Sequence, residues 1–374
     1  MSARAIVLAA GGTGGHMFPA EALAHALLAR GFTVALVTDR RGQAFGDKVP
    51  GVAVHRVRAG RLEAGLMGKV SALADMALGT VEAARLMRVL APAVAVGFGG
   101  YPSVPTMLAA TRRGVVTVLH EQNAILGRAN RLLAPRVATI ATSFASVGAM
   151  PHHTRARIVE TGNPVRPEIA ALRDAAYEAP GEAGPIRLLV LGGSQGARIL
   201  SAIVPAALAL LDPALRGRLV VTQQARSEDV AEVKAAHAAN EIAAEIAPFF
   251  DDVPVRLARA QLVISRAGAS TVAELAAIGR PALLVPYRHA ADDHQTANAK
   301  SLAASGAAWV MTESEFTPQA LAARLALLLA SPAQLEAAAR AAHRIGRPDA
   351  AERLADIVAA AAGGSNGHRQ EDAA

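Results

Sequence analysis

Residues 5–16 read AIVLAAGGTGGH, and residues 186–196 read IRLLVLGGSQG. In both stretches a short aliphatic run ends in two glycines and a hydroxyl residue, and a helical pattern follows. Aliphatic runs that alternate with helical patterns are typical of parallel sheets in α/β proteins. Because the stretch recurs in the second half of the chain, the sequence predicts two similar α/β domains.

The composition fits this fold class. The chain has 374 residues, more than one average domain, and 52% are apolar but only 3% aromatic, so the core must be built mainly from Ala, Val, Leu and Ile. There is no cysteine, which excludes disulfides and thiolate metal sites. The net charge of +7 is spread along the chain and aromatic residues for base stacking are scarce, so we expect no nucleic-acid partner.

The strands predicted for the first half are Ala5–Ala10, Thr33–Val37, Val52–Val57, Ala93–Val96, Val115–Leu119 and Val137–Ala141. Those predicted for the second half are Ile186–Leu191, Arg218–Thr222, Ala244–Pro248, Leu262–Ser265, Ala282–Val285 and Ala308–Met311. Helical patterns include Pro19–Arg30, Ser194–Leu211 and Thr271–Ile278. The polar segment 173–185 (RDAAYEAPGEAGP) has the composition of a linker and suggests a division there.

The two glycine loops are candidate phosphate sites. Glycines between a strand and a helix let the backbone approach a ligand, and the helix N-terminus supplies N–H groups and a positive dipole end. The alternative is a tight turn without a ligand. Neither loop is a P-loop or a G-x-G-x-x-G motif, although Asp39 after the second strand keeps a dinucleotide-binding enzyme as an alternative.

Several polar residues carry two interpretations each. His16 is a general base or a hydrogen-bonding residue at the helix start. Glu274, three residues after Thr271, accepts ribose hydroxyls or completes a capping box. Gln295 and Asn298 share a helix face and bind a carbohydrate or form a solvated helix start. No D-x-D metal motif occurs, so the sequence requires no metal cofactor but leaves divalent metal assistance open.

Residues 66–90 read as an amphipathic helix with an irregular start. Its polar side carries Asp75, Gly79, Glu82 and Arg85, and apolar residues include Leu66, Val70 and Leu73. This helix packs on its own sheet, or it contacts a membrane with help from Lys69 and neighbouring arginines. Both interpretations hold if the later part packs and Leu66–Leu73 is exposed, and we favour this dual role. No apolar run is long enough to span a bilayer.

Six motifs follow one another along the chain: GGTGGH (11–16), GGY (99–101), HEQN (120–123), GNPVR (162–166), GGSQGAR (192–198) and SRAGASTVAE (265–274). The ordered set resembles the MurG family of GT-B glycosyltransferases, glycosyltransferase family 28. The resemblance implies two Rossmann-like parallel-sheet domains facing across a cleft, with a C-terminal helix that crosses back to the N-terminal domain, for which Asp349–Ala361 is the candidate. The implied domains are 1–165 (acceptor and membrane), 166–345 (donor) and 346–362 (returning helix), with a disordered tail at 363–374.

The resemblance also implies roles for residues. Asn123 then faces the donor sugar, Arg166 reaches the nucleotide and the backbone of Phe250 contacts uracil. The resemblance leaves the general base open, and His16 is our predicted candidate for it. Ser194 holds the diphosphate, Glu274 the ribose and Gln295 the GlcNAc hydroxyls. The full predicted set for UDP-GlcNAc is Thr13, Gly14, Gly15, Asn123, Arg166, Ser194, Phe250, Ala269, Ser270, Thr271, Glu274, Gln295 and Asn298. The predicted membrane contacts are Leu66, Lys69, Val70 and Leu73.

The implied activity is an inverting transfer of GlcNAc from UDP-GlcNAc to the 4-hydroxyl of undecaprenyl-diphosphate-MurNAc-pentapeptide (lipid I), which gives lipid II in peptidoglycan synthesis and serves cell shape and division. The implied location is peripheral, on anionic lipid at the cytoplasmic face of the bacterial inner membrane. Non-hydrolysing UDP-GlcNAc 2-epimerases share the architecture and are the main alternative. A nucleotide-sugar-binding protein without activity is the other.

Overall fold

The computed structural model describes residues 4–11, 14–39, 49–60, 66–193 and 196–364, with the backbone alone for 66–70 and 364. The chain forms two compact units. Unit 1 comprises Met1–Arg166 and Asp349–Ala374, and unit 2 comprises Pro167–Pro348. Within the described residues, none of the helices combines the length and hydropathy that crossing a bilayer requires.

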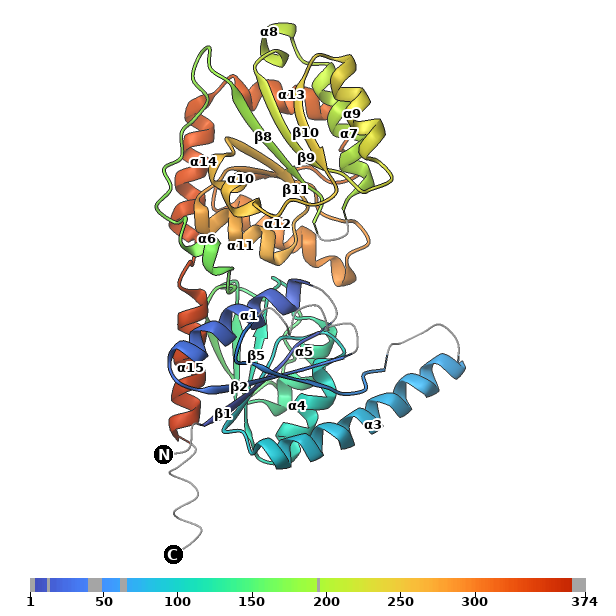
Figure 1. Cartoon of the computed structure of the whole chain (residues 1–374), viewed down its shortest axis with the longest axis vertical. Coiled ribbons are helices and arrows are strands. Elements are labelled where there is room, and N and C mark those ends of the chain that lie inside the picture. The colour runs from blue at the N-terminus through green and yellow to red at the C-terminus, as the bar shows by residue number, and fades with distance from the viewer. Residues whose placement is uncertain (1–3, 12–13, 40–48, 61–65, 194–195, 365–374) are drawn as a thin grey trace, which may run out of the picture. The chain divides into compact units, whose positions relative to one another are not determined.

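Unit 1 is built on a seven-stranded parallel sheet in the order β3-β2-β1-β4-β5-β6-β7 (Figure 1). Its strands are β1 (Ala5–Ala9), β2 (Thr33–Thr38), β3 (Ala53–Arg56), β4 (Val94–Gly97), β5 (Val116–Glu121), β6 (Thr139–Thr142) and β7 (Arg157–Glu160). The six predicted strands are confirmed. The seventh, β7, was not predicted because its sequence RIVE lies at a partly exposed edge and lacks the continuous aliphatic run of a central strand.

Helices cover both faces of this sheet, so successive side chains of β1 enter two different cores. Ile6 and Leu8 belong to one core, which also takes in residues of α1 and α15, and Val7 and Ala9 to the other, which takes in residues of α3, α4 and α5. The helices of unit 1 are α1 (Gly14–Ala29), α3 (Leu66–Leu90), α4 (Ser103–Arg112), α5 (Arg128–Leu133), the 3-10 helix η2 (Ala134–Arg136) and α15 (Ala350–Gly364).

The predicted returning helix is confirmed as α15. Leu354 and Val358 on this helix are fully buried in the core of unit 1, far in sequence from the strands that they cover. Arg30, directly after α1, pairs with Glu352 at 2.5 Å and with Asp356 at 2.8 Å. The roles predicted for the two domains stay predictions. The disordered tail predicted for 363–374 is wrong at Gly363 and Gly364, which belong to α15, and its residues 365–374 lie outside the described residues.

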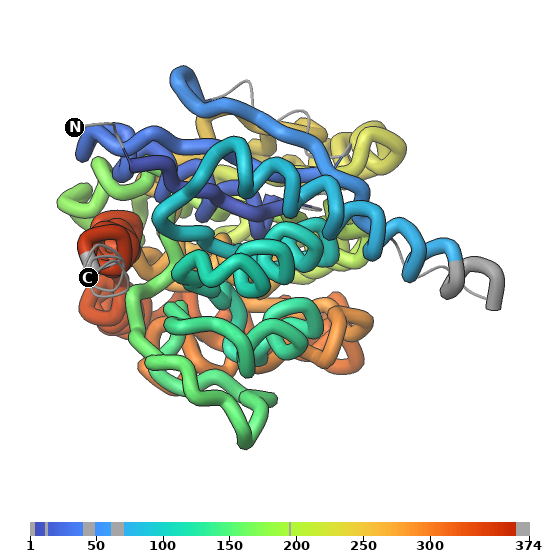
Figure 2. Tube along the Cα trace, turned by 90° about the horizontal axis from the view of Figure 1, so that it is seen from below, coloured from blue at the N-terminus to red at the C-terminus, as the bar shows by residue number. Residues whose placement is uncertain are grey.

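Helix α3 divides into two parts with different surroundings. Its later part packs on α4, with Ala83 and Met87 buried, whereas Leu73 is 72% exposed. The N-terminal end of α3 projects away from the sheet of unit 1 in two perpendicular views (Figures 1 and 2). The polar side predicted for this helix is wrong at Gly79. This glycine is buried against the backbone of Arg58, so closely that a Cβ would lie 1.9 Å from the carbonyl oxygen of Arg58.

Unit 2 has a six-stranded parallel sheet in the order β10-β9-β8-β11-β12-β13, and all six strands were predicted. They are β8 (Ile186–Leu191), β9 (Leu219–Gln224), β10 (Ala243–Ala247), β11 (Leu262–Ser265), β12 (Ala282–Leu284) and β13 (Ala308–Val310). The helices are α6 (Pro167–Ala170), α7 (Arg198–Ala209), α8 (Pro213–Arg216), α9 (Val230–Ala239), α10 (Val253–Arg259), α11 (Ala269–Ile278), η3 (Ala291–Asp293), α12 (His294–Ala304), α13 (Pro318–Leu329) and α14 (Pro332–Ile345).

Two predictions about unit 2 need correction. The segment 173–185 is not the boundary between the units, since it lies inside unit 2. The buried guanidinium of Arg280 donates hydrogen bonds to the carbonyls of Ala175 and Ala176 and so fastens this segment to the unit. Helix α7 begins at Arg198 instead of Ser194, because Gly196 adopts a φ of +68° that ends the loop rather than starting a helix.

Candidate functional site

Both sheets contain one point at which the strand order reverses, and the glycine loops lie there. In unit 1 this point falls between β1 and β4, and in unit 2 between β8 and β11. Loops that leave neighbouring parallel strands in opposite directions open a crevice at the carboxyl ends of the strands, where ligands of α/β proteins bind. The topology therefore places one candidate site in each unit.

In unit 1 the loops after β1 and β4 touch one another. Gly100 has a φ of +73°, and a Cβ there would lie 2.8 Å from the carbonyl oxygen of Gly11 and 3.3 Å from Cδ2 of His16. Only glycine permits this approach. Of the predicted donor contacts on the first loop, Gly14 is buried and Gly15 exposed, whereas Thr13 lies outside the described residues.

His16 stands at the start of a chain of polar contacts. Its Nδ1 lies 3.0 Å from Oε1 of Gln122, and Nε2 of Gln122 lies 3.0 Å from Nδ1 of His120. Nε2 of His120 lies 3.1 Å from the carbonyl oxygen of Gly162. His16 is half-buried and His120 is fully buried. Burial lowers the pKa of His120 from its usual 6.5 to about 4, so this imidazole is neutral at physiological pH.

Asn123, predicted to face the donor sugar, is held by the residue two positions before it. Oε1 of Glu121 accepts hydrogen bonds from the backbone N–H of Asn123 at 3.0 Å and from its Nδ2 at 3.3 Å. Oε2 of Glu121 accepts from the N–H of Gly127 at 2.8 Å and from Nδ2 of Asn130 at 2.9 Å. The buried carboxylate thus fixes the loop that carries Asn123.

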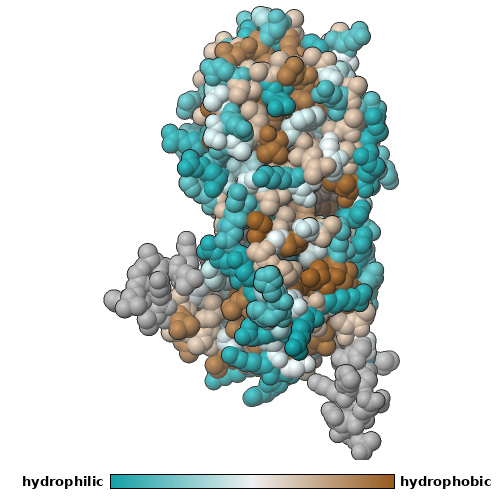
Figure 3. Space-filling view, turned by 180° about the vertical axis from the view of Figure 1, so that it is seen from behind, coloured by the Kyte–Doolittle hydropathy of each residue, from teal (hydrophilic) through white to brown (hydrophobic). Residues whose placement is uncertain are grey.

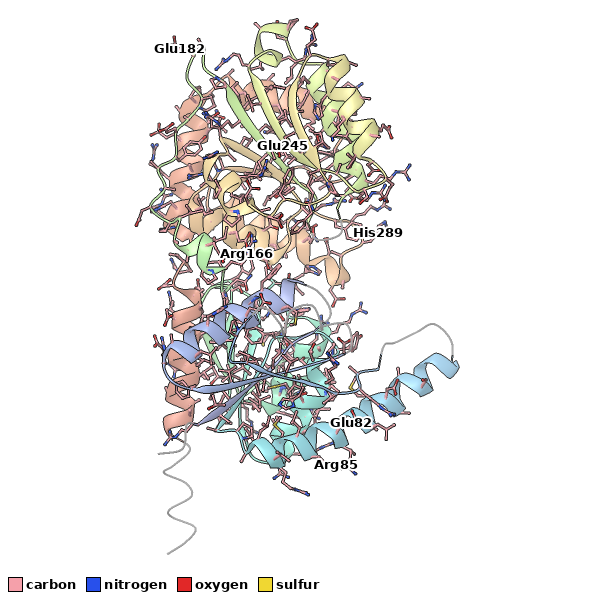
Figure 4. All side chains as sticks on the ribbon, in the orientation of Figure 1. Glu82, Arg85, Arg166, Glu182, Glu245 and His289 are labelled. Atoms are coloured by element: carbon pink, nitrogen blue, oxygen red, sulfur yellow. The ribbon has the colours of Figure 1, made fainter. Side chains whose placement is uncertain are left out.

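Arg166 is the last residue of the first segment of unit 1, Met1–Arg166 (labelled in Figure 4). Its guanidinium lies 5.7 Å from the ring centroid of Phe18, within the range of a cation–π contact. Its predicted contact with the nucleotide stays a prediction.

In unit 2 the loop after β8 makes a tight turn. Gly193 has a φ of +81°, and the N–H of Gly192 donates to Oε1 of Gln224 at 3.1 Å. A Cβ at Gly196 would lie 2.5 Å from Cγ of Arg226. Ser194, predicted to hold the diphosphate, lies outside the described residues.

The second half of this site is the N-terminus of α11, which follows β11 directly. The helix begins at Ala269 with Gly268 as its N-cap, without a side-chain cap, so Thr271 and Glu274 do not form a capping box. Oγ of Ser270 is buried and has no hydrogen-bond partner within the described residues. Free N–H groups and an unsatisfied hydroxyl at a helix N-terminus suit a phosphate group.

Three more predicted residues, Gln295, Asn298 and Phe250, lie in unit 2. Oε1 of Gln295 accepts from the N–H of Tyr287 at 3.0 Å. Asn298 is fully buried, and its Nδ2 donates to the carbonyl of Ala267 at 3.1 Å, so it supports the loop before α11. Phe250 is buried, with the guanidinium of Arg256 4.2 Å from its ring centroid. Sugar and uracil contacts of these residues stay predictions.

The predicted membrane contacts are described only in part. Leu66, Lys69 and Val70 belong to α3, but the structure describes only their backbone, and Leu73 is exposed. Glu82 and Arg85 lie further along the same helix (Figure 4). On the face of the molecule in Figure 3, hydrophobic residues of unit 1 form small groups among hydrophilic ones.

No group of three or more His, Asp or Glu side chains that could hold a metal ion occurs among the described residues.

The sequence did not indicate roles for the residues that support His16 and Asn123. His120, Glu121 and Gln122 were recognised as part of a motif, but only Asn123 received a role. His16 and Gln122 are 106 positions apart in the chain, so their contact follows from the sheet order and not from any local pattern. The available signal was the accumulation of polar residues directly after an aliphatic strand.

Comparison with known structures identifies the fold class. The crystal structure of MurG from Acinetobacter baumannii superimposes with a TM-score of 0.77 at 30% identity, over 95% of this chain and 98% of that chain. Two parallel-sheet units with glycine loops at their switch points, together with this likeness, define a GT-B glycosyltransferase fold.

The chain belongs to glycosyltransferase family 28: the family's N-terminal domain model matches residues 6–142, and its C-terminal domain model matches residues 187–354. A curated relative from Rhodospirillum centenum is 56% identical over 372 residues, which are 100% of this chain and 98% of the relative. Its name is UDP-N-acetylglucosamine–N-acetylmuramyl-(pentapeptide) pyrophosphoryl-undecaprenol N-acetylglucosamine transferase.

The epimerase alternative shares only the fold. UDP-GlcNAc 2-epimerase from Neisseria meningitidis, crystallised with UDP-GlcNAc, matches with a TM-score of 0.66 but at 9% identity, over 95% of this chain and 99% of that chain. At that identity the likeness carries no information about the reaction.

Proposed function

We propose that this chain is an inverting glycosyltransferase that moves GlcNAc from UDP-GlcNAc to the 4-hydroxyl of undecaprenyl-diphosphate-MurNAc-pentapeptide. The observation that carries the proposal is the 56% identity, over the whole chain, to a relative that bears the name of this transferase. The two glycine loops and the polar residues around them offer a contact for each reacting group.

Unit 2 would hold the nucleotide. The diphosphate would lie against the N-terminus of α11, where Ala269, Ser270 and Thr271 present N–H groups and hydroxyls, and against Ser194 on the loop after β8. Negative charge grows on the diphosphate as its bond to C1 breaks, and preorganised donors stabilise that charge most in the transition state. Glu274, one turn further along α11, would accept the ribose hydroxyls.

Unit 1 would supply the base and further donor contacts. The acceptor's 4-hydroxyl loses its proton to His16 while its oxygen attacks C1 from the side opposite UDP. The C1–O bond to UDP breaks, and its electron pair leaves with the diphosphate. Attack from the opposite side converts an α-linked donor into a β-linked product. Thr13, Gly14, Gly15, Asn123 and Arg166 would complete the donor contacts of this unit.

The lipid substrate would bring unit 1 to the membrane. We propose peripheral attachment at the cytoplasmic face of the inner membrane through the first part of α3, where Leu66, Lys69, Val70 and Leu73 follow one another. The exposure of Leu73 and the projecting helix support this assignment. An exposed apolar side chain with a neighbouring lysine is the combination that anionic lipid surfaces bind.

A transfer assay separates the three candidate functions. Radiolabelled UDP-GlcNAc is incubated with enzyme alone, with a lipid I analogue, and with the matched 4-deoxy analogue, which has no hydroxyl to glycosylate. A transferase moves the label to the lipid fraction only with the intact acceptor. An epimerase converts the donor without acceptor, and a protein that merely binds the donor gives neither product.

The same assay tests metal dependence when a chelator is added. The helix N-terminus and hydroxyls at α11 offer donors for the leaving diphosphate, so we expect an unchanged rate. A loss of transfer that added Mg²⁺ restores would contradict this expectation without affecting the assignment as a transferase.

A further inference from the structure

The contacts behind His16 determine where its hydrogen sits. The carbonyl oxygen of Gly162 can only accept, so Nε2 of His120, 3.1 Å away, must carry a hydrogen and donate it. Because His120 is neutral, its Nδ1 then has a lone pair and accepts. The first imidazole is therefore fixed by a backbone group that cannot change its protonation.

The tautomer of His120 in turn fixes the orientation of the Gln122 side-chain amide. Its Nε2 lies 3.0 Å from Nδ1 of His120 and 3.0 Å from the backbone carbonyl oxygen of His120. Both partners are acceptors, so the amide NH₂ group must face them, and a flipped amide would set oxygen against oxygen. Oε1 of Gln122 is consequently the atom that faces His16.

His16 is the last residue in this series of hydrogen bonds. Its Nδ1 lies 3.0 Å from Oε1 of Gln122, which can only accept, so Nδ1 carries the hydrogen. The lone pair of the neutral ring is then on Nε2. Within the described residues no hydrogen bond to this Nε2 is present, and the ring is half-buried, so the atom is open to a ligand.

We propose that Gln122 and His120 are positioning residues that hold His16 in the Nδ1–H tautomer, so that Nε2 is the atom that takes the proton of the acceptor hydroxyl. The proposal rests on the proposed function of His16. In the step, the acceptor O–H bond breaks and an N–H bond forms at Nε2, while Nδ1–H stays bonded to the amide oxygen. An uncharged amide does not take up the proton, so the proton leaves to water from Nε2 afterwards.

A second buried glutamine–histidine pair in unit 2 provides a matched control. Oε1 of Gln223 lies 3.0 Å from Nε2 of His237, and both residues are buried. Burial also lowers the pKa of His237 from 6.5 to about 4. As in the contact between Gln122 and His16, the amide oxygen of a glutamine here faces a ring nitrogen of a histidine, but this pair has no part in the proposed reaction.

The direct test is nitrogen NMR on the full-length enzyme with ¹⁵N-labelled histidine at mildly alkaline pH, with signals assigned by single histidine variants. Long-range ¹H–¹⁵N spectra distinguish protonated from unprotonated ring nitrogens. We expect the hydrogen of His16 on Nδ1 and that of His120 on Nε2. A hydrogen on Nε2 of His16 in the wild-type enzyme overturns the proposal.

Kinetics supply the second arm. Gln122→Met keeps the size of the side chain but removes the acceptor for His16, so we expect both tautomers in the spectrum and a kcat lower by about two- to tenfold, the effect of one hydrogen bond. KM for UDP-GlcNAc should not change. We expect Gln223→Met to lower Tm about as much as Gln122→Met does. It should leave kcat and the His16 signals unchanged.

Equal kcat and equal His16 spectra in Gln122→Met and wild type also overturn the proposal. Failure of the proposed base is a separate outcome: His16→Ala would then retain kcat, whatever tautomer the wild-type spectrum shows.

Discussion

Glu121 and Glu274 are both buried carboxylates, but their neighbours assign them different tasks. Glu121 accepts four hydrogen bonds from N–H groups, three from the loop that follows it and one from Asn130 of α5, so its oxygens are used within the fold. Glu274 is on the helix whose N-terminus leaves Oγ of Ser270 without a partner among the described residues. We propose that Glu274, one turn behind this terminus, accepts the hydroxyls of a ribose.

Glu274→Ala should therefore raise the KM for UDP-GlcNAc by about ten- to hundredfold, since charge-assisted hydrogen bonds contribute about 1.5–3 kcal/mol. Steady-state kinetics at varied donor concentration measure the effect, and thermal unfolding serves as the control. An unchanged KM combined with a clear loss of Tm would make Glu274 a structural residue.

His16 should act on kcat instead of donor binding, because its proton transfer takes place only in the transition state. We expect His16→Ala to reduce kcat by about 10²–10⁴ with the donor KM little changed. Single-turnover measurements with saturating donor and acceptor isolate the chemical step. Turnover near the wild-type rate would remove His16 from the mechanism.

At the scale of elements, the two parts of α3 differ in their surroundings, as the sequence pattern predicted. Its later part is anchored by Ala83 and Met87, and its first part presents Leu73 to solvent. Leu73→Glu should weaken binding to anionic vesicles, because it removes apolar area and adds repulsion, and should leave Tm unchanged.

Leu327 on α13 in unit 2 is a matched control, since it is 68% exposed against 72% for Leu73. Leu327→Glu should bind vesicles like the wild type in co-sedimentation. If both variants and the wild type bind anionic and neutral vesicles equally, α3 is not the membrane contact, and another surface must meet the lipid substrate.

The strands were the most predictable elements because a central parallel strand must be aliphatic on both faces. Ala5–Ala9 and Leu262–Ser265 are recognisable for this reason alone. The edge strand β7 is exposed on one side and gives no such signal. The close approach of Arg58 to Gly79 also escaped prediction, since it depends on a contact between segments that no periodicity encodes.

Within the candidate site, the sequence predicted the glycine loops better than the side-chain contacts that support the site. Glycines after a strand indicate a ligand loop from local chemistry, and the observed sheet orders place both loops at switch points. The contact of His16 with Gln122 depends on β1 and β5 being separated by a single strand, which only the assembled sheet reveals.

At the scale of the whole molecule, stability should depend on buried histidines. The pKa of His120 is about 4 in the folded chain against 6.5 for an exposed imidazole. Between these values the unfolded chain binds a proton that the folded chain excludes, so this contribution is complete above pH 6.5 and is lost as the pH falls toward 4.

The free energy of unfolding should accordingly fall by up to about 1.4 kcal/mol for each pH unit across that window on account of His120. His237, whose pKa is also lowered to about 4, adds a similar term in unit 2. Thermal unfolding across the window measures the slope. His120→Gln should give a shallower slope for unit 1 than wild type, and parallel slopes would contradict a neutral buried His120.

At the scale of the whole molecule, each of the two units has a glycine loop at its switch point, and the chain belongs to glycosyltransferase family 28. From these observations we infer an inverting transfer of GlcNAc to a muramyl lipid. The most direct test is the linkage in the product made by the full-length enzyme from UDP-GlcNAc and a lipid I analogue. Proton NMR of the isolated disaccharide reports both the anomeric configuration and the substituted hydroxyl. We predict a β linkage to the 4-hydroxyl, and an α linkage, a different hydroxyl or the absence of any disaccharide would contradict the claim.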